Sequence, residues 1–171
     1  MTIHSDNPFA TPSDQRDQFR QLRGRLVASV SVAASGDENR RYGVTVSSLW
    51  VVEGDEPLVA VLVGAGSEFA EVSAESEAFT AHVLSETHRP IAEVFAGMRP
   101  APGGMFESTS VSQSEWGPRL DAVADWAGCR LAAIHTIGTQ QLVTGLIEHV
   151  ELSDLVKPLT YFRGAYRSLR S

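Results

Sequence analysis

RYGVTVSSLWVV, residues 41–52, begins as a strand and then places three small hydroxyl side chains, Thr45, Ser47 and Ser48, among its valines. A Leu-Trp pair follows the serines. The residues alone leave two interpretations open. The hydroxyls can simply face water on one side of a sheet. Alternatively, the end of the strand is a shelf, where small side chains let a flat heteroaromatic ring approach the backbone and hydroxyls bind its phosphate or its edge.

The neighbouring segments predict a mainly β protein around this stretch. Residues 27–35, VASVSVAAS, alternate valine with serine, which indicates a strand with one buried face. The turn residues SGDENRR join it to the opening stretch as a hairpin. Residues 57–64, PLVAVLVG, form the short continuous apolar run of a strand buried on both faces. Further strand patterns lie at residues 78–85, 129–138, 140–150 and 158–169.

Helical patterns are fewer, and they do not separate the strands regularly. Phe19, Leu22 and Leu26 recur at helical spacing after Ser13, which can cap a helix. Residues 67–76 and 88–97 also fit helices. Six or seven strands with two or three helices predict a mainly β barrel or sandwich. The irregular alternation argues against a doubly wound parallel sheet.

Length and composition predict one domain preceded by an arm. The 171 residues suit a single domain. Residues 1–12 are polar and contain two prolines, which predicts a flexible N-terminal arm, and residues 13–171 form the domain. The formal net charge of −7 argues against a broad basic footprint for nucleic acid or an anionic membrane surface.

Three features predict a cytoplasmic protein. Cys129 is the only cysteine, so no intrachain disulfide can form. The N-terminus lacks the apolar core of a signal peptide. No apolar run approaches the ~18 residues of a membrane span.

The usual patterns of catalytic and metal sites are weak. No two of the five histidines lie at i, i+4 on a helix, and Cys129 has no cysteine partner, so no metal site is expected. Ser47 and Ser48 are not in a G-x-S-x-G elbow. Cys129 lies among apolar residues, which favours a buried small hydrophobic side chain over a reactive thiol.

The glycine-rich loop GAGSEF, residues 64–69, starts like a dinucleotide fingerprint, but Phe69 stands where glycine or alanine is needed. The loop follows a buried strand and ends at a helix N-cap, where backbone N–H groups can hold a phosphate. Glu68 and Glu71 in the first helical turn oppose an anion there.

Taken in order along the chain, these segments resemble the flavin reductase-like, FMN-binding split-barrel family. Its reductases read G-[MV]-T-[AV]-S-[AS] followed by a PPL strand, and this chain has GVTVSS followed by EPLVAVLV. FTAHVLS, IAEVFA, CRLAAI and YFRGAY match the later motifs of the family in the same order. The resemblance covers about residues 25–170.

The resemblance implies a split β-barrel of Greek-key type with six or seven strands and two or three peripheral helices. It implies a homodimer that moves hydride from NADH or NADPH to FMN or FAD and supplies the reduced flavin to a partner monooxygenase. No residue is assigned a certain catalytic role. The implied cofactor-binding residues are Val44, Thr45, Val46, Ser47, Ser48, Gly64, Ala65, Gly66 and Ser67, and those on the nicotinamide or interface side are Gln140, Tyr161, Arg163 and Tyr166.

The chain departs from the family pattern at two positions. Gly64 replaces an amide side chain in the phosphate loop, and Gln140 stands where a histidine is common. Glutamine can form hydrogen bonds but cannot carry a proton near neutral pH. These departures support an alternative: a flavin-binding carrier without enzymatic activity, or a split-barrel oxidoreductase that uses another electron donor. An obligate dimer with a purely structural role is a third hypothesis, which rests only on the apolar content.

Overall fold

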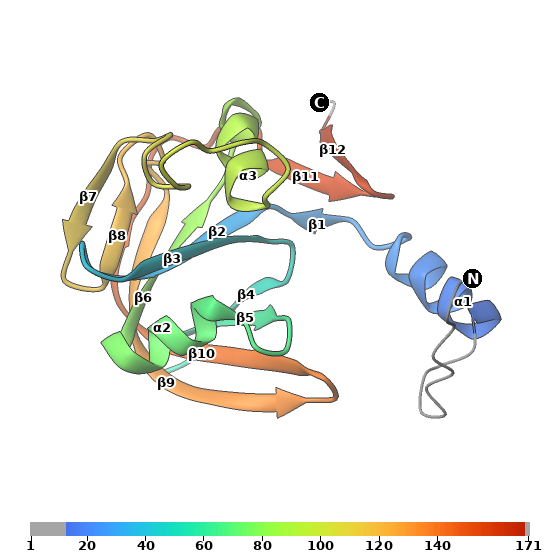
Figure 1. The fold of residues 1–171 in the computed structure, drawn as a ribbon, viewed down its shortest axis with the longest axis horizontal. Helices are drawn as coiled ribbons and strands as arrows, with labels where there is room; N and C mark the ends of the chain where they lie inside the picture. Colours follow the sequence, from blue (N-terminus) through green and yellow to red (C-terminus); the bar gives the residue numbers. More distant parts are fainter. Residues whose placement is uncertain (1–12, 170–171) are drawn as a thin grey trace, which may run out of the picture.

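The computed structural model describes residues 13–169, with side chains from residue 18 onward. The flexible arm predicted for residues 1–12 lies outside these described residues. No helix within them is both long and apolar enough to cross a membrane. The elements, in chain order (Figure 1), are α1 (Ser13–Arg23), β1 (Ala28–Ser29), β2 (Ser31–Gly36), β3 (Arg41–Val46), β4 (Leu49–Val52), β5 (Leu58–Val63), α2 (Glu68–Ser76), β6 (Ala78–Val83), η1 (Glu86–His88), α3 (Arg89–Phe95), β7 (Val111–Ser114), β8 (Gly117–Leu120), β9 (Trp126–Ile137), β10 (Gln140–Glu151), β11 (Leu159–Phe162) and β12 (Ala165–Ser168).

The main sheet has seven antiparallel strands in the order β3-β2-β6-β9-β10-β5-β4. Its two edge strands, β3 and β4, are joined by only Ser47 and Ser48. A two-residue link spans less than about 12 Å, so the sheet must curl until its edges meet. The backbone N–H of Leu62 on β5 donates to the Ser48 carbonyl at 3.1 Å, which extends the β4–β5 pairing to the link between the two edges. The curled sheet confirms the predicted mainly β split barrel.

Two smaller sheets complete the β structure. β1, β11 and β12 form one, and β7 pairs with β8 to form the other. The strand patterns identified in the sequence do not include residues 111–120, so they miss the β7–β8 pair. The strand β8 contains Gly117 and Pro118, which usually disfavour strands.

Strand β2 is buried on both faces, unlike its predicted single buried face. Val32 belongs to one core cluster and Ala33 to a second one. Ser35, expected at the surface, is buried, and its hydroxyl donates to the Ala78 carbonyl at 2.7 Å. Helices α2 and α3 both pack against β2 and β3. The alternation of valine with small serines therefore indicates a central strand that is buried on both faces. Only small side chains fit on its second face.

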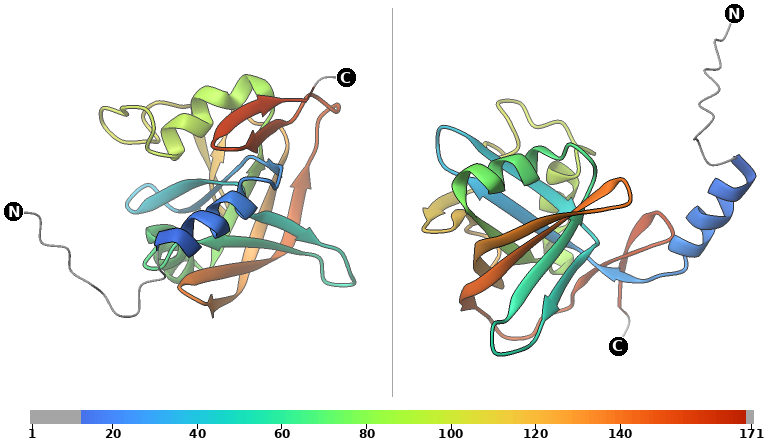
Figure 2. Two further views of the ribbon diagram at one scale, coloured as in Figure 1. Left: turned by 90° about the vertical axis from the view of Figure 1, so that its right-hand side faces the viewer. Right: turned by 90° about the horizontal axis from the view of Figure 1, so that it is seen from below.

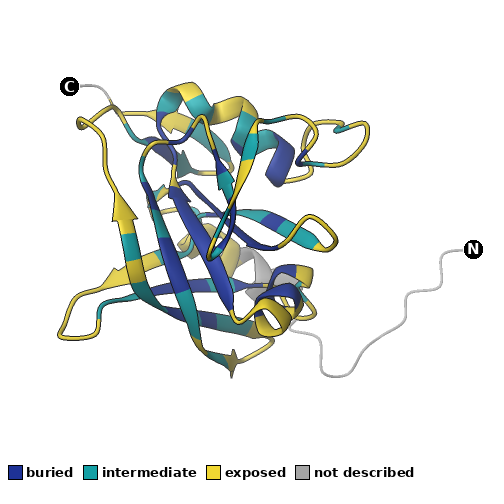
Figure 3. Cartoon of the chain, turned by 90° about the vertical axis from the view of Figure 1, so that its left-hand side faces the viewer, coloured by how far each residue is buried: buried dark blue, intermediate teal, exposed yellow. Residues whose placement is uncertain are grey.

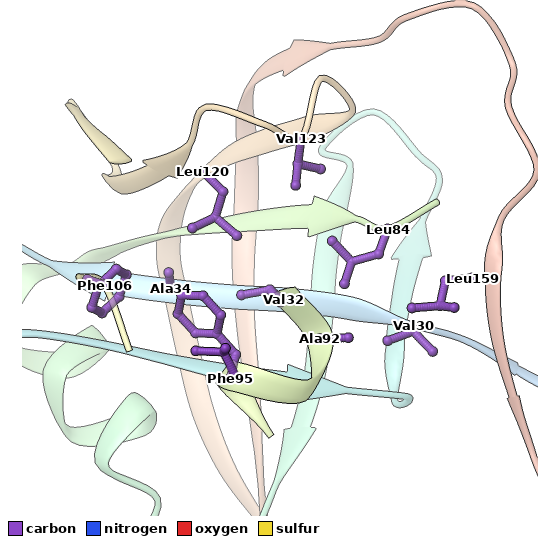
Figure 4. Close-up of a cluster of buried hydrophobic side chains, with 11 residues drawn as sticks. Val30, Val32, Ala34, Leu84, Ala92, Phe95, Phe106, Leu120, Val123 and Leu159 are labelled. Atoms are coloured by element: carbon purple, nitrogen blue, oxygen red, sulfur yellow. The ribbon is translucent and has the colours of Figure 1, made fainter. Parts of the chain in front are cut away.

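The two core clusters divide the molecule. The first lies beneath α3, and the second lies inside the curl of the sheet against Phe69 and Ala70 of α2. Figure 3 shows buried residues gathered in the strands and exposed residues in the loops around them. The side chains of the first cluster (Figure 4) include Val30, Val32, Ala34, Leu84, Ala92, Phe95, Phe106, Leu120, Val123 and Leu159.

Candidate functional site

The corner, Ser47 and Ser48, holds the two edges of the main sheet together. The Ser48 hydroxyl donates to the Leu62 carbonyl at 2.7 Å, and the Ser48 carbonyl accepts from the same residue. The Ser48 hydroxyl proton is therefore engaged with the protein backbone in this structure. The Ser47 hydroxyl has no hydrogen-bond partner in the described part of the chain, which leaves it available to a ligand.

The strand before the corner presents two different faces. Val44 and Val46 pack with the second core cluster, and Thr45 points the other way, where its hydroxyl donates to the Ala92 carbonyl of α3 at 2.8 Å. This bond also uses the only proton of the Thr45 hydroxyl. Among the three hydroxyls of the predicted shelf, Ser47 is the one whose proton remains free within the described residues.

The loop Gly64–Ser67 follows β5 and leads into α2. Gly64, Ala65 and Gly66 are exposed, and a Cβ added at either glycine would meet no atom within 4 Å. Gly66 adopts φ +65°, which favours glycine, and the Ser67 N–H donates to the Gly64 carbonyl at 3.2 Å. Ser67 is the N-cap of α2, yet its side chain makes no capping hydrogen bond. The loop is thus an open turn in which the Ser67 hydroxyl makes no capping hydrogen bond.

The negative charge of the first turn of α2 is partly neutralised by an arginine side chain. Glu71 forms an ion pair with Arg40 at 3.6 Å, and Arg40 also pairs with Glu75. Glu68 has no ion-pair partner among the described residues, so its charge still opposes an anion at this helix end.

Strand register brings three of the predicted groups to one end of the barrel. Leu49 of β4 lies opposite Val61, so β4 begins where β5 is about to end. Gln141 lies opposite Val63, so Gln140 at the start of β10 neighbours the loop that begins at Gly64. The corner, the phosphate loop and Gln140 therefore share one end of the main sheet.

A hollow of about 180 Å³ opens beside the corner. This volume is below the roughly 300–1,000 Å³ of a typical ligand pocket, so the hollow accommodates a ring system rather than a whole dinucleotide. The rings of Tyr161 and Tyr166 pack edge to face on the wall of the hollow, with their centroids 5.6 Å apart. The complete lining is Arg23, Val30, Thr45, Val46, Ser47, Ala96, Met98, Tyr161 and Tyr166.

The hollow joins some of the predicted residues and omits others. It unites Thr45, Val46 and Ser47 with Tyr161 and Tyr166, which are more than 100 positions away in the sequence. The other predicted residues do not line it: Val44, Ser48, Gly64, Ala65, Gly66, Ser67, Gln140 and Arg163.

Two of the omitted residues have clear placements. Val44 packs toward the second core cluster, and Arg163 is exposed at the turn between β11 and β12 with φ +51°. Sequence reasoning missed Arg23 and Met98 as lining residues. Neither lies in a motif, so only their spatial position could reveal them.

Electrostatics on the tyrosine side favour the neutral phenol. Burial raises the pKa of Tyr166, and the nearby negative charge of Glu93 raises it further. The Tyr166 hydroxyl points to the Met98 sulfur at 4.0 Å. Tyr166 therefore remains protonated around neutral pH and can donate a hydrogen bond or pack its ring against a ligand.

Two buried groups outside the hollow are structural. The His82 ring accepts from the Leu120 N–H at 3.1 Å and donates to the Val32 carbonyl at 3.2 Å, and burial lowers its pKa to about 4. Burial also raises the pKa of the Cys129 thiol to about 12, so the thiol is unreactive, as its apolar surroundings predicted. The described residues contain no group of three histidine, cysteine or acidic side chains placed to hold a metal ion.

Comparison with known protein families shows that residues 23–170 match the flavin reductase like domain. The chain is 31% identical over 156 residues to the reductase component of 4-hydroxyphenylacetate 3-monooxygenase from Thermus thermophilus, covering 90% of this chain and 97% of that protein. It is 25% identical over 158 residues to an NADH-dependent FMN reductase from Bradyrhizobium diazoefficiens, covering 92% and 86% of the two chains.

A solved structure shows the same fold. The NADH:FAD oxidoreductase from Streptomyces globisporus superposes with a TM-score of 0.83 at 18% identity, covering 95% of this chain and 98% of that one. At this identity the likeness concerns the fold alone.

Proposed function

Because this chain belongs to the flavin reductase like domain family, we propose that it is an NADH- or NADPH-dependent flavin reductase. It supplies reduced FMN or FAD to a partner monooxygenase. One observation carries this assignment: the match to reductase components extends over nearly the whole chain and over nearly the whole length of the relatives. We also propose that residues 13–171 work as one domain and that two copies form a homodimer.

The residues at the corner fit a flavin on two structural grounds. The open loop at Gly64 and Gly66 leaves room for a phosphate against the backbone, and the hydroxyls of Ser47 and Ser67 are unspent within the described residues. When bound, the flavin supplies a ring that accepts hydride from the nicotinamide. The protein's part is to position both rings in contact, since hydride transfer depends mainly on proximity and orientation.

Each group of residues contributes to that positioning. The backbone of residues 44–48 supports the ring, and the Ser47 hydroxyl donates to its polar edge. Ser67 and the amides of residues 64–66 bind the phosphate. Tyr161 and Tyr166 form the opposite wall and limit the entry of water.

The remaining predicted residues act at the margin of the site. Gln140 orients a ring by hydrogen bonding, but its amide cannot exchange a proton near neutral pH. Ser48 acts indirectly, because its hydroxyl proton holds β4 and β5 together.

A direct assay tests this function. The full-length protein is mixed with FMN or FAD, and oxidation of NADH or NADPH is followed by the loss of nicotinamide absorbance. We expect saturable acceleration that requires added flavin, with one nucleotide preferred. Absence of acceleration with all four pairs would refute the reductase assignment.

Gly64 and Gln140 favour one alternative, a flavin carrier that uses no nicotinamide. Gly64 lacks the amide side chain of the family pattern, and Gln140 lacks the imidazole. Tight flavin binding, measured by quenching of flavin fluorescence, together with no nicotinamide turnover would favour the carrier. A protein that binds no flavin would contradict both functions.

A further inference from the structure

The hollow beside the corner is too small for a nicotinamide dinucleotide, so most of a bound dinucleotide must lie outside it. Its volume of about 180 Å³ suits one ring system. The ribose and diphosphate of the donor then lie on the rim, where the surrounding side chains select what binds. The lining contains one charged residue, the exposed Arg23. The inference developed from this rim rests on the proposed reductase function.

Two further arginines lie against the wall of the hollow. The Arg89 guanidinium lies 5.7 Å from the centre of the Tyr166 ring, within the range of a cation–π contact. Arg99 directly follows Met98, a lining residue whose sulfur lies 4.0 Å from the Tyr166 hydroxyl. Figure 1 and the left view of Figure 2 show α3, which begins at Arg89, beside the β11–β12 hairpin, which carries Tyr166. Both arginines are therefore at the rim of the hollow.

The end of α3 fixes the position of Arg99. The Gly97 N–H donates to the Val94 carbonyl at 3.0 Å. The Met98 N–H donates to the Glu93 carbonyl at 2.9 Å. These two bonds form a Schellman motif, in which Gly97 adopts the left-handed conformation with φ +67°. The chain therefore turns back over the helix end and brings Arg99 beside the Glu93 side chain.

Glu93 orients the two arginines and leaves each with free donors. One carboxylate oxygen accepts from Arg89 Nε and the other from an Arg99 terminal nitrogen, both at 2.8 Å. The other guanidinium N–H groups form no hydrogen bond with the described residues, and the two side chains are 60% and 52% exposed. The bond from Arg89 lowers the pKa of Glu93, so this carboxylate is ionised at neutral pH.

We call Arg89, Glu93 and Arg99 the rim triad. Its two positive charges and one negative charge leave a net charge of +1, and Arg23 adds a further positive charge at the hollow. The whole chain, in contrast, has a formal net charge of −7. The mouth of the hollow is therefore a local positive site that favours an anionic ligand group.

We propose that the rim triad binds the diphosphate of the nicotinamide donor while the nicotinamide ring enters the hollow. A guanidinium presents N–H groups in a planar fork, which matches the oxygens of a phosphate. The proposed flavin phosphate site lies elsewhere, because the loop Gly64–Ser67 leads into α2 and does not line the hollow. The two phosphate sites thus lie on different elements, so flavin and donor can occupy the protein together.

The test compares two hydride donors, with FMN as the acceptor. NADH carries the diphosphate, whereas 1-benzyl-1,4-dihydronicotinamide carries the same reacting ring and no phosphate. One variant, Arg89→Gln with Arg99→Gln, removes both positive charges of the rim triad. A second variant, Glu93→Gln, removes its negative charge. The matched control is Arg130→Gln, which changes an arginine that pairs with two glutamates and does not line the hollow.

We expect the double variant to raise the KM for NADH roughly tenfold with little change in kcat, because it loses charge-assisted hydrogen bonds to the donor. Glu93→Gln should lower the same KM roughly threefold, since only the repulsive charge is lost. The control should behave as wild type, and all variants should use the benzyl donor equally within about twofold. A triad with a merely structural role would also raise the KM in Glu93→Gln, and that result would overturn the proposal.

A binding measurement separates this proposal from the reductase assignment. ADP-ribose carries the diphosphate without nicotinamide, so its calorimetric titration into flavin-free protein needs no turnover. We expect the double variant to bind it roughly tenfold more weakly than wild type and the control do. Absence of binding to wild type, or equal affinity of wild type and the double variant, would overturn the site even if the enzyme is active.

A flavin titration distinguishes the donor from FAD, which also contains a diphosphate. We expect the double variant to bind FMN and FAD as wild type does. Weaker binding of FAD alone, with the KM for NADH unchanged, would assign the rim triad to the flavin and overturn the proposal. Expected binding of ADP-ribose without turnover of any donor would refute the reductase assignment and leave the diphosphate site supported.

Discussion

Two adjacent serines at the corner have different neighbours, and the difference separates stability from binding. The Ser48 hydroxyl donates to the Leu62 carbonyl. Ser47 lines the hollow, and its hydroxyl makes no hydrogen bond with the described residues. The sequence SS presents the two residues as equivalent. Their roles differ because successive side chains of an extended chain point in opposite directions.

The pair provides its own matched control. Ser47→Ala should raise the flavin Kd by roughly tenfold, as expected for one lost hydrogen bond to a polar ligand group, with little change in stability. Ser48→Ala should lower the free energy of unfolding by about 1 kcal/mol and leave the flavin Kd within about twofold. Fluorescence titration and urea denaturation measure the two quantities. If Ser48→Ala weakens binding more than Ser47→Ala, the ring lies elsewhere.

At the scale of elements, the long hairpin of β9 and β10 packs on the core through a glycine. The register between these strands shifts at Gly145, and a Cβ there would lie 2.4 Å from the Phe79 ring and 2.9 Å from the Cys129 Cβ. Phe79 cannot move away easily, because it is fully buried and packs edge-to-face on Phe69. Gly145 therefore lets β10 approach the second core cluster closely.

Gly145→Ala should destabilise the protein by about 1–3 kcal/mol through overpacking. Gly54→Ala is the matched control, since its added Cβ meets no atom within 4 Å and should change stability by less than about 0.5 kcal/mol. Thermal or urea unfolding of both variants measures the difference. Equal stability of the two variants would show that the β9–β10 hairpin shifts freely against Phe79.

At the scale of the whole molecule, His82 connects three strands through one neutral ring. It lies on β6, and its two nitrogens bond the backbone of Val32 on β2 and Leu120 on β8. A second proton on the ring would break the contact with the Leu120 N–H and place a charge in the core. The folded state therefore resists protonation of His82, while the unfolded chain accepts a proton near pH 6.5.

Stability should consequently fall as the pH is lowered from about 6.5 towards 4, because the unfolded state then binds one more proton than the folded state. The full effect is about 3 kcal/mol over this range. Acidic groups with lowered pKa values, such as Asp121 and Glu93, add losses below their ordinary pKa range, so the interval from pH 6.5 to 5 isolates His82. Urea unfolding at several pH values measures the slope.

His82→Gln should be less stable at neutral pH, and its stability should vary less between pH 6.5 and 5. His135→Gln is the control, because His135 is exposed on β9 and its replacement leaves the contacts of His82 unchanged, so the slope should be preserved. A slope that survives His82→Gln would assign the pH dependence to another group.

Much of the fold was predictable from local patterns, and much of the site was not. Alternation and turn residues predicted the strands of the main sheet, and Ser67 and the glycines predicted the open loop. Local pattern missed the second buried face of β2 and the β7–β8 pair, because both depend on what packs against them. The family resemblance predicted the residue types at the site. It did not predict that the hydroxyls of Thr45 and Ser48 donate to backbone carbonyl groups of the protein.

The sequence by itself determined the β class, the reductase resemblance and the single inert cysteine, because strand periodicity, motif order and composition are properties of the chain. Only the tertiary structure decided which residues share the hollow and which hydroxyl protons remain free. Tyr161 and Tyr166 reach Ser47 because β11 pairs with β1, and β1 leads directly into β2, the neighbour of β3. This pairing depends on contacts between distant residues, and no local pattern of the sequence contains them.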